Sequence, residues 1–236
     1  MGRIITIANQ KGGVGKTTTA INLSACLAEA GQHVMLVDFD PQGNASSGLG
    51  VEKEDYEHTV YDMMAEEADL DECLVKNIQD NLDVLPSDMN LAGAEIEFQE
   101  VEDKETLLKR YLDKVRDDYD FILIDCPPSL NILTINALTA ADTVLVPIQC
   151  EYYALEGLNQ VLKTVELVKR KLNPQLELEG VVFTMYDART NLSLQVVESV
   201  KNNLNQTIYK TIIPRNVRLA EAPSHGKSIN LYDTRS

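Results

Sequence analysis

Residues 9–18 read NQKGGVGKTT, and this stretch decides the fold. It follows a strand-like apolar run, Arg3 to Ala8, and leads into an amphipathic helical pattern, Thr17 to Ala30, that ends at Gly31. Glycines allow backbone N–H groups to turn inward around an anion, and the positive end of the following helix faces the same point. The order of strand, glycine loop and helix therefore predicts a phosphate-binding loop.

Apolar runs and helix-length amphipathic segments alternate along the rest of the chain. Runs rich in Val and Ile are typical of strands that are buried on both faces. Their alternation with helices predicts an α/β fold: a doubly wound, predominantly parallel sheet flanked by helices, with ligands at the carboxyl ends of the strands. The further predicted strands are His33 to Asp38, Asn81 to Leu85 (the weakest), Phe121 to Asp125, Thr143 to Pro147 and Leu178 to Met185, and the further helices are Leu155 to Leu172 and Asn191 to Leu204.

Charge is distributed unevenly over a chain whose formal net charge is -16. Residues 52–120 contain 23 acidic and 7 basic residues, whereas residues 180–236 contain 7 basic and 4 acidic. We expect the acidic stretch to form helices outside the sheet, and residues 76–90, with Pro86 and several Asp and Asn, to form loops. The basic C-terminal quarter is compatible with a nucleic-acid-binding face, and solvated surface charge is the alternative explanation.

Length and composition favour one intracellular domain. A chain of 236 residues that is 44% hydrophobic can bury a substantial core, so we expect a single domain over residues 1–236 that contains the phosphate loop. The sequence contains neither a secretion signal nor an apolar stretch long enough to span a membrane. Its four widely spaced cysteines form no C-x-x-C pair, which favours reduced thiols over disulfides or an iron-sulfur cluster. These features predict a cytoplasmic protein.

The end of the glycine loop carries the residue types that bind ATP and Mg²⁺. Lys16 is expected to reach the β- and γ-phosphates, and the Thr17 hydroxyl to bind Mg²⁺. The strict G-x-x-x-x-G-K-[ST] pattern fails at Gln10, and Lys11 adds a second charge. A tight turn with solvated lysines is the alternative, but it does not explain the ordered combination of strand, loop and helix. The expected nucleotide-binding residues of the loop are Gly12, Gly13, Val14, Gly15, Lys16, Thr17 and Thr18.

Two aspartates end predicted strands at the edge where ligands are expected. Asp125 closes an apolar strand, as does the aspartate that holds Mg²⁺ through water in phosphate-loop enzymes. Asp38 closes an earlier strand and is placed for a supporting role at the same metal. A helix N-cap or turn is the alternative for any single aspartate, but the neighbouring phosphate loop favours metal binding.

The sequence KGGVGKTT, residues 11–18, resembles the deviant Walker A loop of the ParA/MinD superfamily of ATPases. In that family the lysine that corresponds to Lys11 crosses a dimer interface and contacts the phosphates of the partner's ATP. Lysines from both sides would offset the repulsion between two facing triphosphates. The resemblance of DFDPQGN, residues 38–44, implies that Asp40 positions or activates the attacking water. The expected catalytic residues are Lys11, Lys16 and Asp40.

The resemblance covers the whole chain and is nearest to the ParA/Soj branch of partitioning ATPases. It extends through DFDPQGNASSGLG (38–50), DCPPSL (125–130), QCEYYALEG (149–157), MYDARTNL (185–192) and IPRNVRLAEAPSHG (213–226). It implies an ATP-dependent homodimer that binds DNA without sequence preference at the nucleoid, and a ParB/Spo0J-type partner that stimulates hydrolysis and release. It also implies that Pro214 and Asn216 contact the purine. Arg189 and Arg218 are expected to contact DNA. Further candidates for the same basic patch are Arg215, Lys201, Lys210 and Lys227.

Two alternative functions use the same loop. A MinD-like ATPase would bind a membrane surface and should lack the arginine-containing segments, so we expect no membrane partner here. A metabolic synthetase would need a small-molecule pocket and in many cases would lack Lys11. Similar chains continue past a segment such as residues 231–236 into another helix, so we expect that helix to be absent.

Overall fold

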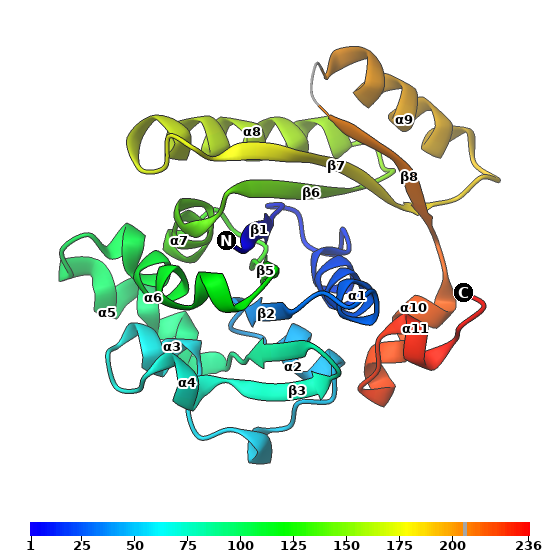
Figure 1. Ribbon diagram of the computed structural model, residues 1–236. Coiled ribbons are helices and arrows are strands. Elements are labelled where there is room, and N and C mark those ends of the chain that lie inside the picture. Colours follow the sequence, from blue (N-terminus) through cyan, green and yellow to red (C-terminus); the bar gives the residue numbers. More distant parts are fainter. Residues whose placement is uncertain (205–206) are drawn as a thin grey trace.

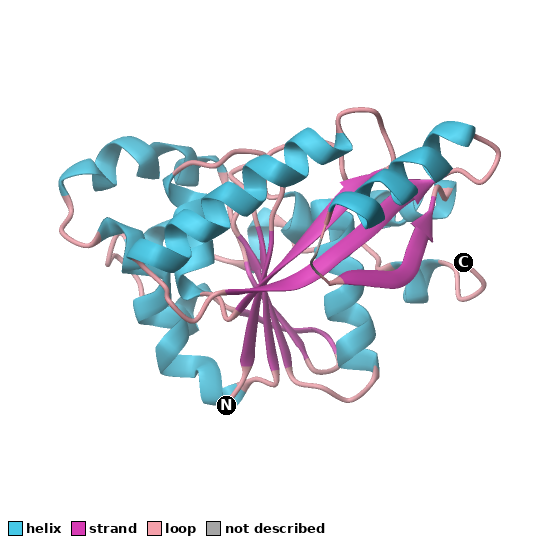
Figure 2. Cartoon of the chain, turned by 90° about the horizontal axis from the view of Figure 1, so that it is seen from above, coloured by secondary structure: helices cyan, strands magenta, loops and turns pink. Residues whose placement is uncertain are grey.

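One sheet with helices on both faces organises the structure, a computed structural model that describes residues 1–204 and 207–236 (Figures 1 and 2). The strands are β1 (Arg3–Ile7), β2 (Val34–Asp38), β3 (Val75–Gln79), β4 (Leu82–Leu85), β5 (Phe121–Asp125), β6 (Thr143–Gln149), β7 (Glu177–Tyr186) and β8 (Ile208–Pro214). Within the described residues their order is β3-β4-β2-β5-β1-β6-β7-β8. All neighbouring strands pair in parallel except β3 and β4, which confirms the predicted α/β fold.

The helices differ widely in length and divide between the two faces of the sheet. They are α1 (Lys16–Glu29), α2 (Asn44–Gly48), α3 (Val60–Met64), α4 (Leu70–Cys73), α5 (Ala94–Glu97), α6 (Leu107–Val115), α7 (Ile132–Ala140), α8 (Ala154–Lys171), α9 (Asn191–Asn203), α10 (Val217–Glu221) and α11 (Ile229–Tyr232). Helix α1 packs on one face of the sheet and contacts α2 and α11, whereas α7 and α8 pack on the opposite face (Figure 1).

Burial on both faces explains why the central strands are apolar throughout. Every residue of β2 is buried, since Leu36 packs toward Ala25 of α1 and Met35 lies in the core on the other face. Phe183 of β7 is fully buried in that second core, together with residues of α7 and α8. The continuous apolar runs of the sequence therefore correspond to a sheet with no solvent-facing side at its centre.

The predicted strands and helices agree with the observed ones to within two residues at each end. The expectation of loops over residues 76–90 is wrong for residues 76–79, because β3 pairs there with the predicted strand β4 in an antiparallel hairpin. Asn77 and Asn81 adopt left-handed backbone conformations, with φ of 56° and 64°, and the Asp83 carboxylate accepts a hydrogen bond from the Asn77 backbone. The Asn and Asp residues thus shape a bulged hairpin rather than an irregular loop.

Strand β8 and helix α7 lack a clear signal in the sequence. Strand β8 lies at the edge of the sheet, and its residues are exposed or only partly buried, so they lack the apolar run of a central strand. Helix α7 is buried along most of its length, which removes the polar stripe that marks an amphipathic helix. Burial by neighbours that are distant in sequence determines both patterns.

Candidate functional site

Strand register brings the predicted acidic residues and the glycine loop to one edge of the sheet. Asp38 at the end of β2 lies directly opposite Asp125 at the end of β5, and Asp125 lies opposite Ile7 at the end of β1. The glycine loop begins immediately after Ile7 and leads into α1. Residues separated by more than one hundred positions in the chain therefore surround one point.

The glycine loop is held in shape by its own backbone and by β7. Gly13 and Gly15 have φ of 72° and 87°, in the left-handed region where a side chain is strained, and α1 begins directly after Gly15. The Thr184 hydroxyl donates a hydrogen bond of 2.8 Å to the Val14 carbonyl. Asn9 anchors the entry to the loop, since its side-chain amide donates to the Pro147 carbonyl at 2.8 Å.

Lys16 is buried at the start of α1, with 6% of its surface exposed. Burial lowers its pKa, and the nearby Asp125, Cys126 and Asp40 oppose that shift. Its ammonium donates a hydrogen bond of 3.2 Å to the Lys11 carbonyl, so it points back across the loop. A buried ammonium at a helix N-terminus attracts anions strongly, because little water screens it.

Asp38 is fully buried and held by α2. Its Oδ2 accepts hydrogen bonds of 2.8 Å from both the backbone N–H and the hydroxyl of Ser46, and its Oδ1 accepts a longer one, 3.3 Å, from the Asp40 backbone. Burial raises the pKa of Asp38 to about 6, although the Ser46 hydrogen bonds oppose the shift. The sequence analysis did not identify Ser46, whose role becomes visible only once α2 folds against β2.

Asp125 is also fully buried, and in the described part of the chain neither carboxylate oxygen makes a hydrogen bond of normal geometry. Burial and the neighbouring Asp38 raise its pKa well above the usual value. The Thr17 hydroxyl lies near enough to oppose that rise. Unpartnered buried carboxylate oxygens are unusual and costly, and with the Thr17 hydroxyl they form the oxygen donor set that Mg²⁺ prefers. The residues present therefore fit a magnesium site.

Asp40 begins the segment that leads from β2 into α2, and only 7% of its surface is exposed. Its Oδ1 accepts a hydrogen bond of 3.0 Å from the Gln42 backbone, and its carbonyl accepts one of 2.9 Å from Gly43. It is the second carboxylate, after Asp125, that acts on the Lys16 ammonium. Asp38, Asp40 and Asp125 are thus brought together as the sequence predicted.

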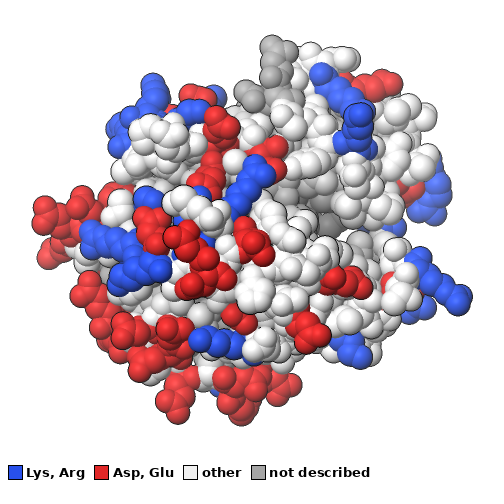
Figure 3. Space-filling view, in the orientation of Figure 1, with Lys and Arg blue, Asp and Glu red and all other residues white. Residues whose placement is uncertain are grey.

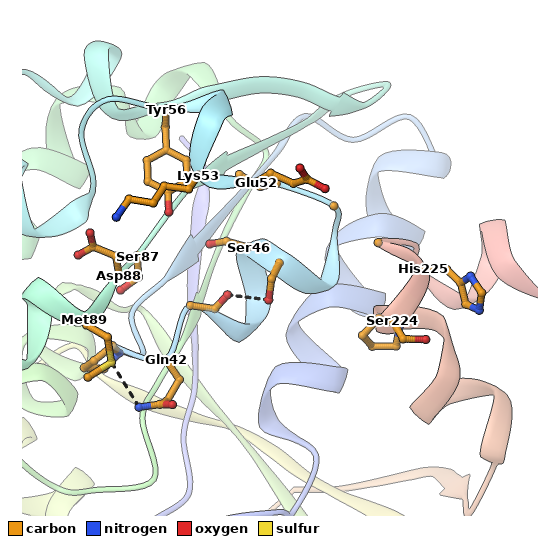
Figure 4. A pocket seen from close by; sticks show the side chains of 17 residues that line it. Gln42, Ser46, Glu52, Lys53, Tyr56, Ser87, Asp88, Met89, Ser224 and His225 are labelled. Carbon is orange, nitrogen blue, oxygen red and sulfur yellow. Dashed lines mark hydrogen bonds between the residues drawn. The ribbon is translucent and has the colours of Figure 1, made fainter.

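Beyond this segment, α2 borders a cavity of about 830 Å³ (Figure 4). Its lining includes Gln42, Ser46, Ser87 and His225, which come from three separate parts of the chain. The Gln42 side-chain amide contacts the Met89 sulfur at 3.6 Å across this space. The segment that follows Asp40 therefore has the acidic cluster on one side and an open cavity on the other.

Lys11 projects from the loop and is only partly buried, with 35% of its side chain exposed. Its ammonium pairs with the carboxylate of Glu151 at 2.6 Å. Glu151 follows the end of β6, and 47% of its side chain is exposed. The sequence analysis gave Glu151 no role, although its place just after a strand was a usable signal.

Pro214 and Asn216 lie at the carboxyl end of β8, beside the end of β7. Tyr186 of β7 pairs with Pro214, and Asn216 caps α10 by accepting a hydrogen bond of 2.9 Å from the Arg218 backbone. The Asn216 amide also bonds to the Ser236 hydroxyl. Because a Cβ on Gly15 would lie 3.7 Å from Thr184 of β7, this end of the sheet adjoins the glycine loop.

Figure 3 shows acidic residues crowded over the region of α3 to α6, whereas the side formed by β8, α9 and the C-terminal helices carries several Lys and Arg and fewer acidic residues. Other Lys and Arg lie near α6 and α8. Arg189 is 87% exposed and makes two hydrogen bonds, of 2.8 and 2.7 Å, to the carboxylate of Asp187. Arg215 lies near enough to act on the same carboxylate. The Arg189 pairing holds the pKa of Asp187 well below its usual range.

Arg218 is farther along, on α10, and pairs with Glu221 at 2.8 Å and with Asp233 at 3.7 Å. The structure therefore gathers Arg189 and Arg215 around one carboxylate and gives Arg218 its own acidic partners. Three further candidates for the basic patch are exposed: Lys201 on α9, Lys210 on β8 and Lys227 before α11.

Comparisons with known proteins agree over most of the chain. A protein-family model described as an AAA domain matches residues 2–178. Sporulation initiation inhibitor protein Soj of Bacillus subtilis is 61% identical over 236 residues, which are all of this chain and 93% of that protein. Chromosome partitioning protein ParA of Caulobacter vibrioides is 52% identical over 233 residues, 98% of this chain and 87% of that protein.

Solved structures share the fold and add ligands. Cobyrinic acid a,c-diamide synthase from Mycobacterium smegmatis, with bound ATP analogue and magnesium, has a TM-score of 0.87 and 40% identity, covering 92% of this chain and 86% of its own. The septum site-determining protein MinD from Pyrococcus horikoshii, complexed with Mg-ADP, has a TM-score of 0.83 and 27% identity, covering 100% and 90%. In residues 1–204 and 207–236 of the present chain, no helix is long and apolar enough to cross a bilayer.

Proposed function

This chain belongs to the ParA/Soj family of chromosome-partitioning ATPases, and we propose that it is a switch driven by ATP hydrolysis whose ATP-bound dimer binds DNA. The observation that carries the proposal is the cluster at the carboxyl edge of the sheet. There, Lys16 and the carboxylates of Asp38, Asp40 and Asp125 are buried beside the glycine loop. The cluster has three buried carboxylates and one buried ammonium, and unpaired buried charges destabilise the folded state. A bound nucleotide with its metal ion would stabilise these charges.

ATP is the proposed substrate, and each group of the loop has a distinct role. The loop backbone and the N-terminus of α1 would bind the phosphates, and the Lys16 ammonium would turn from the Lys11 carbonyl to the β- and γ-phosphates. Thr17, Asp38 and Asp125 would hold Mg²⁺, which when bound offsets the negative charge that the phosphates share. Pro214 and Asn216 are the proposed contacts for the purine.

Asp40 is the proposed positioning group for the attacking water. Its backbone carbonyl and one carboxylate oxygen are fixed by Gly43 and Gln42 at the start of the α2 segment. Hydrolysis would convert ATP to ADP and phosphate, and the loss of the γ-phosphate would release this segment. Ser46 would transmit the change, because it joins α2 to Asp38.

Lys11 is proposed to act in the partner subunit. It lies at the exposed side of the loop, where a second copy of the chain could be reached, and its charge would offset the repulsion between two facing triphosphates. Pairing of subunits would then depend on ATP. Lys11 and Lys16 would stabilise the charge on the transferring phosphoryl group from opposite sides.

DNA is the proposed macromolecular partner of the dimer, bound through Arg189, Arg215 and Arg218. All three lie within residues 180–236, where basic residues outnumber acidic ones, and this supports phosphate contacts, which carry no sequence information. A protein with this activity would be held at the nucleoid. A ParB/Spo0J-type protein is the proposed trigger for hydrolysis and release, by relationship to the ParA and Soj proteins.

Sedimentation velocity with ADP, ATP or a non-hydrolysable ATP analogue tests the dimer scheme, with and without duplex DNA. We expect a monomer with ADP, a dimer with ATP or the analogue, and DNA binding only by the dimer. Lys11→Ala should abolish the pairing, and Asp40→Ala should trap an ATP-bound dimer. Pairing that survives Lys11→Ala, or an unchanged rate of hydrolysis in Asp40→Ala, would contradict the roles given to these residues.

A metabolic synthetase is the second candidate, because solved structures described as cobyrinic acid a,c-diamide synthase are up to 40% identical to this chain. A synthetase would couple ATP turnover to an acceptor carboxylate. Turnover that rises with cobyrinic acid and an ammonia source, and not with DNA and the partner protein, would favour it. We expect no response to the acid.

A further inference from the structure

The ion pair between Lys11 and Glu151 lies within one subunit, although Lys11 is the residue proposed to serve the neighbouring one. Its N–O distance of 2.6 Å is short for an ion pair, and both side chains are partly exposed. A phosphate of a partner's nucleotide would compete with this carboxylate for the same ammonium. The ion pair therefore opposes contact between Lys11 and a partner's nucleotide.

Glu151 is fixed in place by its own backbone. Its N–H donates a hydrogen bond of 2.8 Å to the Gln149 carbonyl, and its carbonyl accepts one of 3.0 Å from Ala154 at the start of α8. The backbone of this turn is therefore tied to β6 and α8, and it places the Glu151 carboxylate within reach of Lys11.

The loop is tied to the same support. The Lys11 backbone N–H donates a hydrogen bond of 3.0 Å to the Asn9 side chain, and Asn9 in turn bonds to the Pro147 carbonyl of β6. A Cβ on Gly157 of α8 would lie 3.7 Å from that Asn9 side chain. Loop, strand and helix thus hold Lys11 and Glu151 opposite each other.

We propose that Glu151 is a positioning residue that retains Lys11 in its own subunit until a partner's ATP competes for it. This inference rests on the proposed role of Lys11 in the dimer. ATP carries one more phosphate than ADP and competes better for the ammonium, so the Glu151 pair sharpens the discrimination between the two nucleotides. Partly exposed ion pairs are weak, and the pair can therefore be broken at ordinary ATP concentrations.

Glu151→Gln in the full-length chain tests the proposal, because it removes the charge and keeps the shape. Sedimentation velocity would be titrated with the non-hydrolysable ATP analogue and Mg²⁺, and separately with Mg-ADP. We expect the analogue concentration for half-maximal pairing to fall by about twofold to tenfold, as expected when a weak ion pair is removed from each of two subunits. We also expect measurable pairing with ADP.

Nucleotide affinity of the monomer, measured with a fluorescent analogue at protein concentrations too low for pairing, should not change. If Glu151 had only a structural role, its substitution would change the nucleotide affinity of the monomer or its thermal stability. The ratio between the concentrations of ATP analogue and of ADP needed for pairing would then stay the same. The matched control is Glu166→Gln, which removes one exposed carboxylate from a later turn of α8 and should shift neither titration.

Glu151→Asp provides a second measurement if the glutamine variant does not fold. It keeps the charge but withdraws the carboxylate by one methylene, so it should lower the concentration for half-maximal pairing less than Glu151→Gln does. Variants of Glu151 that pair at the wild-type concentration or above it would overturn the proposal. If they do so while Lys11→Ala fails to pair, the proposed function stands and only the role of Glu151 falls.

Discussion

Asp38 and Asp125 are fully buried at the ends of adjacent strands, whereas Arg189 is 87% exposed beyond β7 and paired with the carboxylate of Asp187. Burial raises the pKa of both buried carboxyls, and Asp125 has no hydrogen bond of normal geometry within the described residues. On the basic side, the neighbouring arginine lowers the pKa of Asp187. The edge with the glycine loop thus stores unfavourable electrostatic energy that a ligand can relieve, while Arg189 and Arg218 on the basic side already have acidic partners.

The largest effect is expected for Lys16→Ala, which removes the ammonium buried beside the acidic residues. Because that charge has little water to screen it, we expect nucleotide affinity to fall by about a hundredfold or more. Titration calorimetry with Mg-ATP measures the change. Lys163→Ala, an exposed position on α8, is the control and should bind nucleotide normally. Equal affinities in the two variants would mean that Lys16 does not contact the phosphates.

The next largest effect is expected for Asp125→Asn, which should raise the stability of the fold. The folded-state pKa of this carboxyl lies above its unfolded value, so the charged form destabilises the fold at neutral and higher pH. Without Mg²⁺ at pH 8, we expect the free energy of unfolding to rise by about 1–3 kcal/mol, because a buried unpartnered charge is removed. Urea denaturation measures it.

The sign of the pH dependence follows from the same shift. As pH falls through the folded-state pKa values, of which that of Asp38 is about 6, the wild-type carboxyls take up protons and the penalty disappears. The advantage of Asp125→Asn should therefore shrink between pH 8 and pH 5. Asp117→Asn, at an exposed aspartate, should change stability by no more than about 0.5 kcal/mol at either pH. If the stability gain of Asp125→Asn instead grew as the pH fell, the Asp125 carboxylate would not be destabilising in the folded protein.

The smallest effects are expected on the basic side. Arg189→Ala should weaken the binding of the ATP-loaded dimer to nonspecific duplex DNA and lower the slope of log affinity against log salt by about 0.9 for each phosphate that the arginine neutralises. Asp187→Asn should free the arginine and strengthen binding by about twofold to fivefold at low salt. Fluorescence anisotropy at several salt concentrations measures both.

Glu198→Gln on α9 is the control for Asp187→Asn, since it removes a charge from the same side without an arginine pair among the described residues. If both substitutions strengthen binding equally, net charge alone explains the result and the Arg189 pair has no special role. Unchanged binding in Arg189→Ala would remove this residue from the DNA surface.

The sequence determined the order of the central strands and longer helices and the position of the glycine loop, because the relevant signals are local. Glycines 13 and 15 must accommodate left-handed backbone, the buried strands need Val and Ile, and an aspartate that ends such a strand faces the ligand edge. The charge count likewise indicated which quarter of the chain is basic.

Tertiary structure alone decided which charges meet. The contacts of Asp38 with Ser46 and of Lys11 with Glu151 depend on how α2 and the start of α8 pack, and no local pattern encodes these. The hairpin at β3 and β4 and the edge strand β8 depend in the same way on neighbours. A sequence specifies conformations through short-range sterics, whereas the energy of a charge depends on burial and on groups from distant segments.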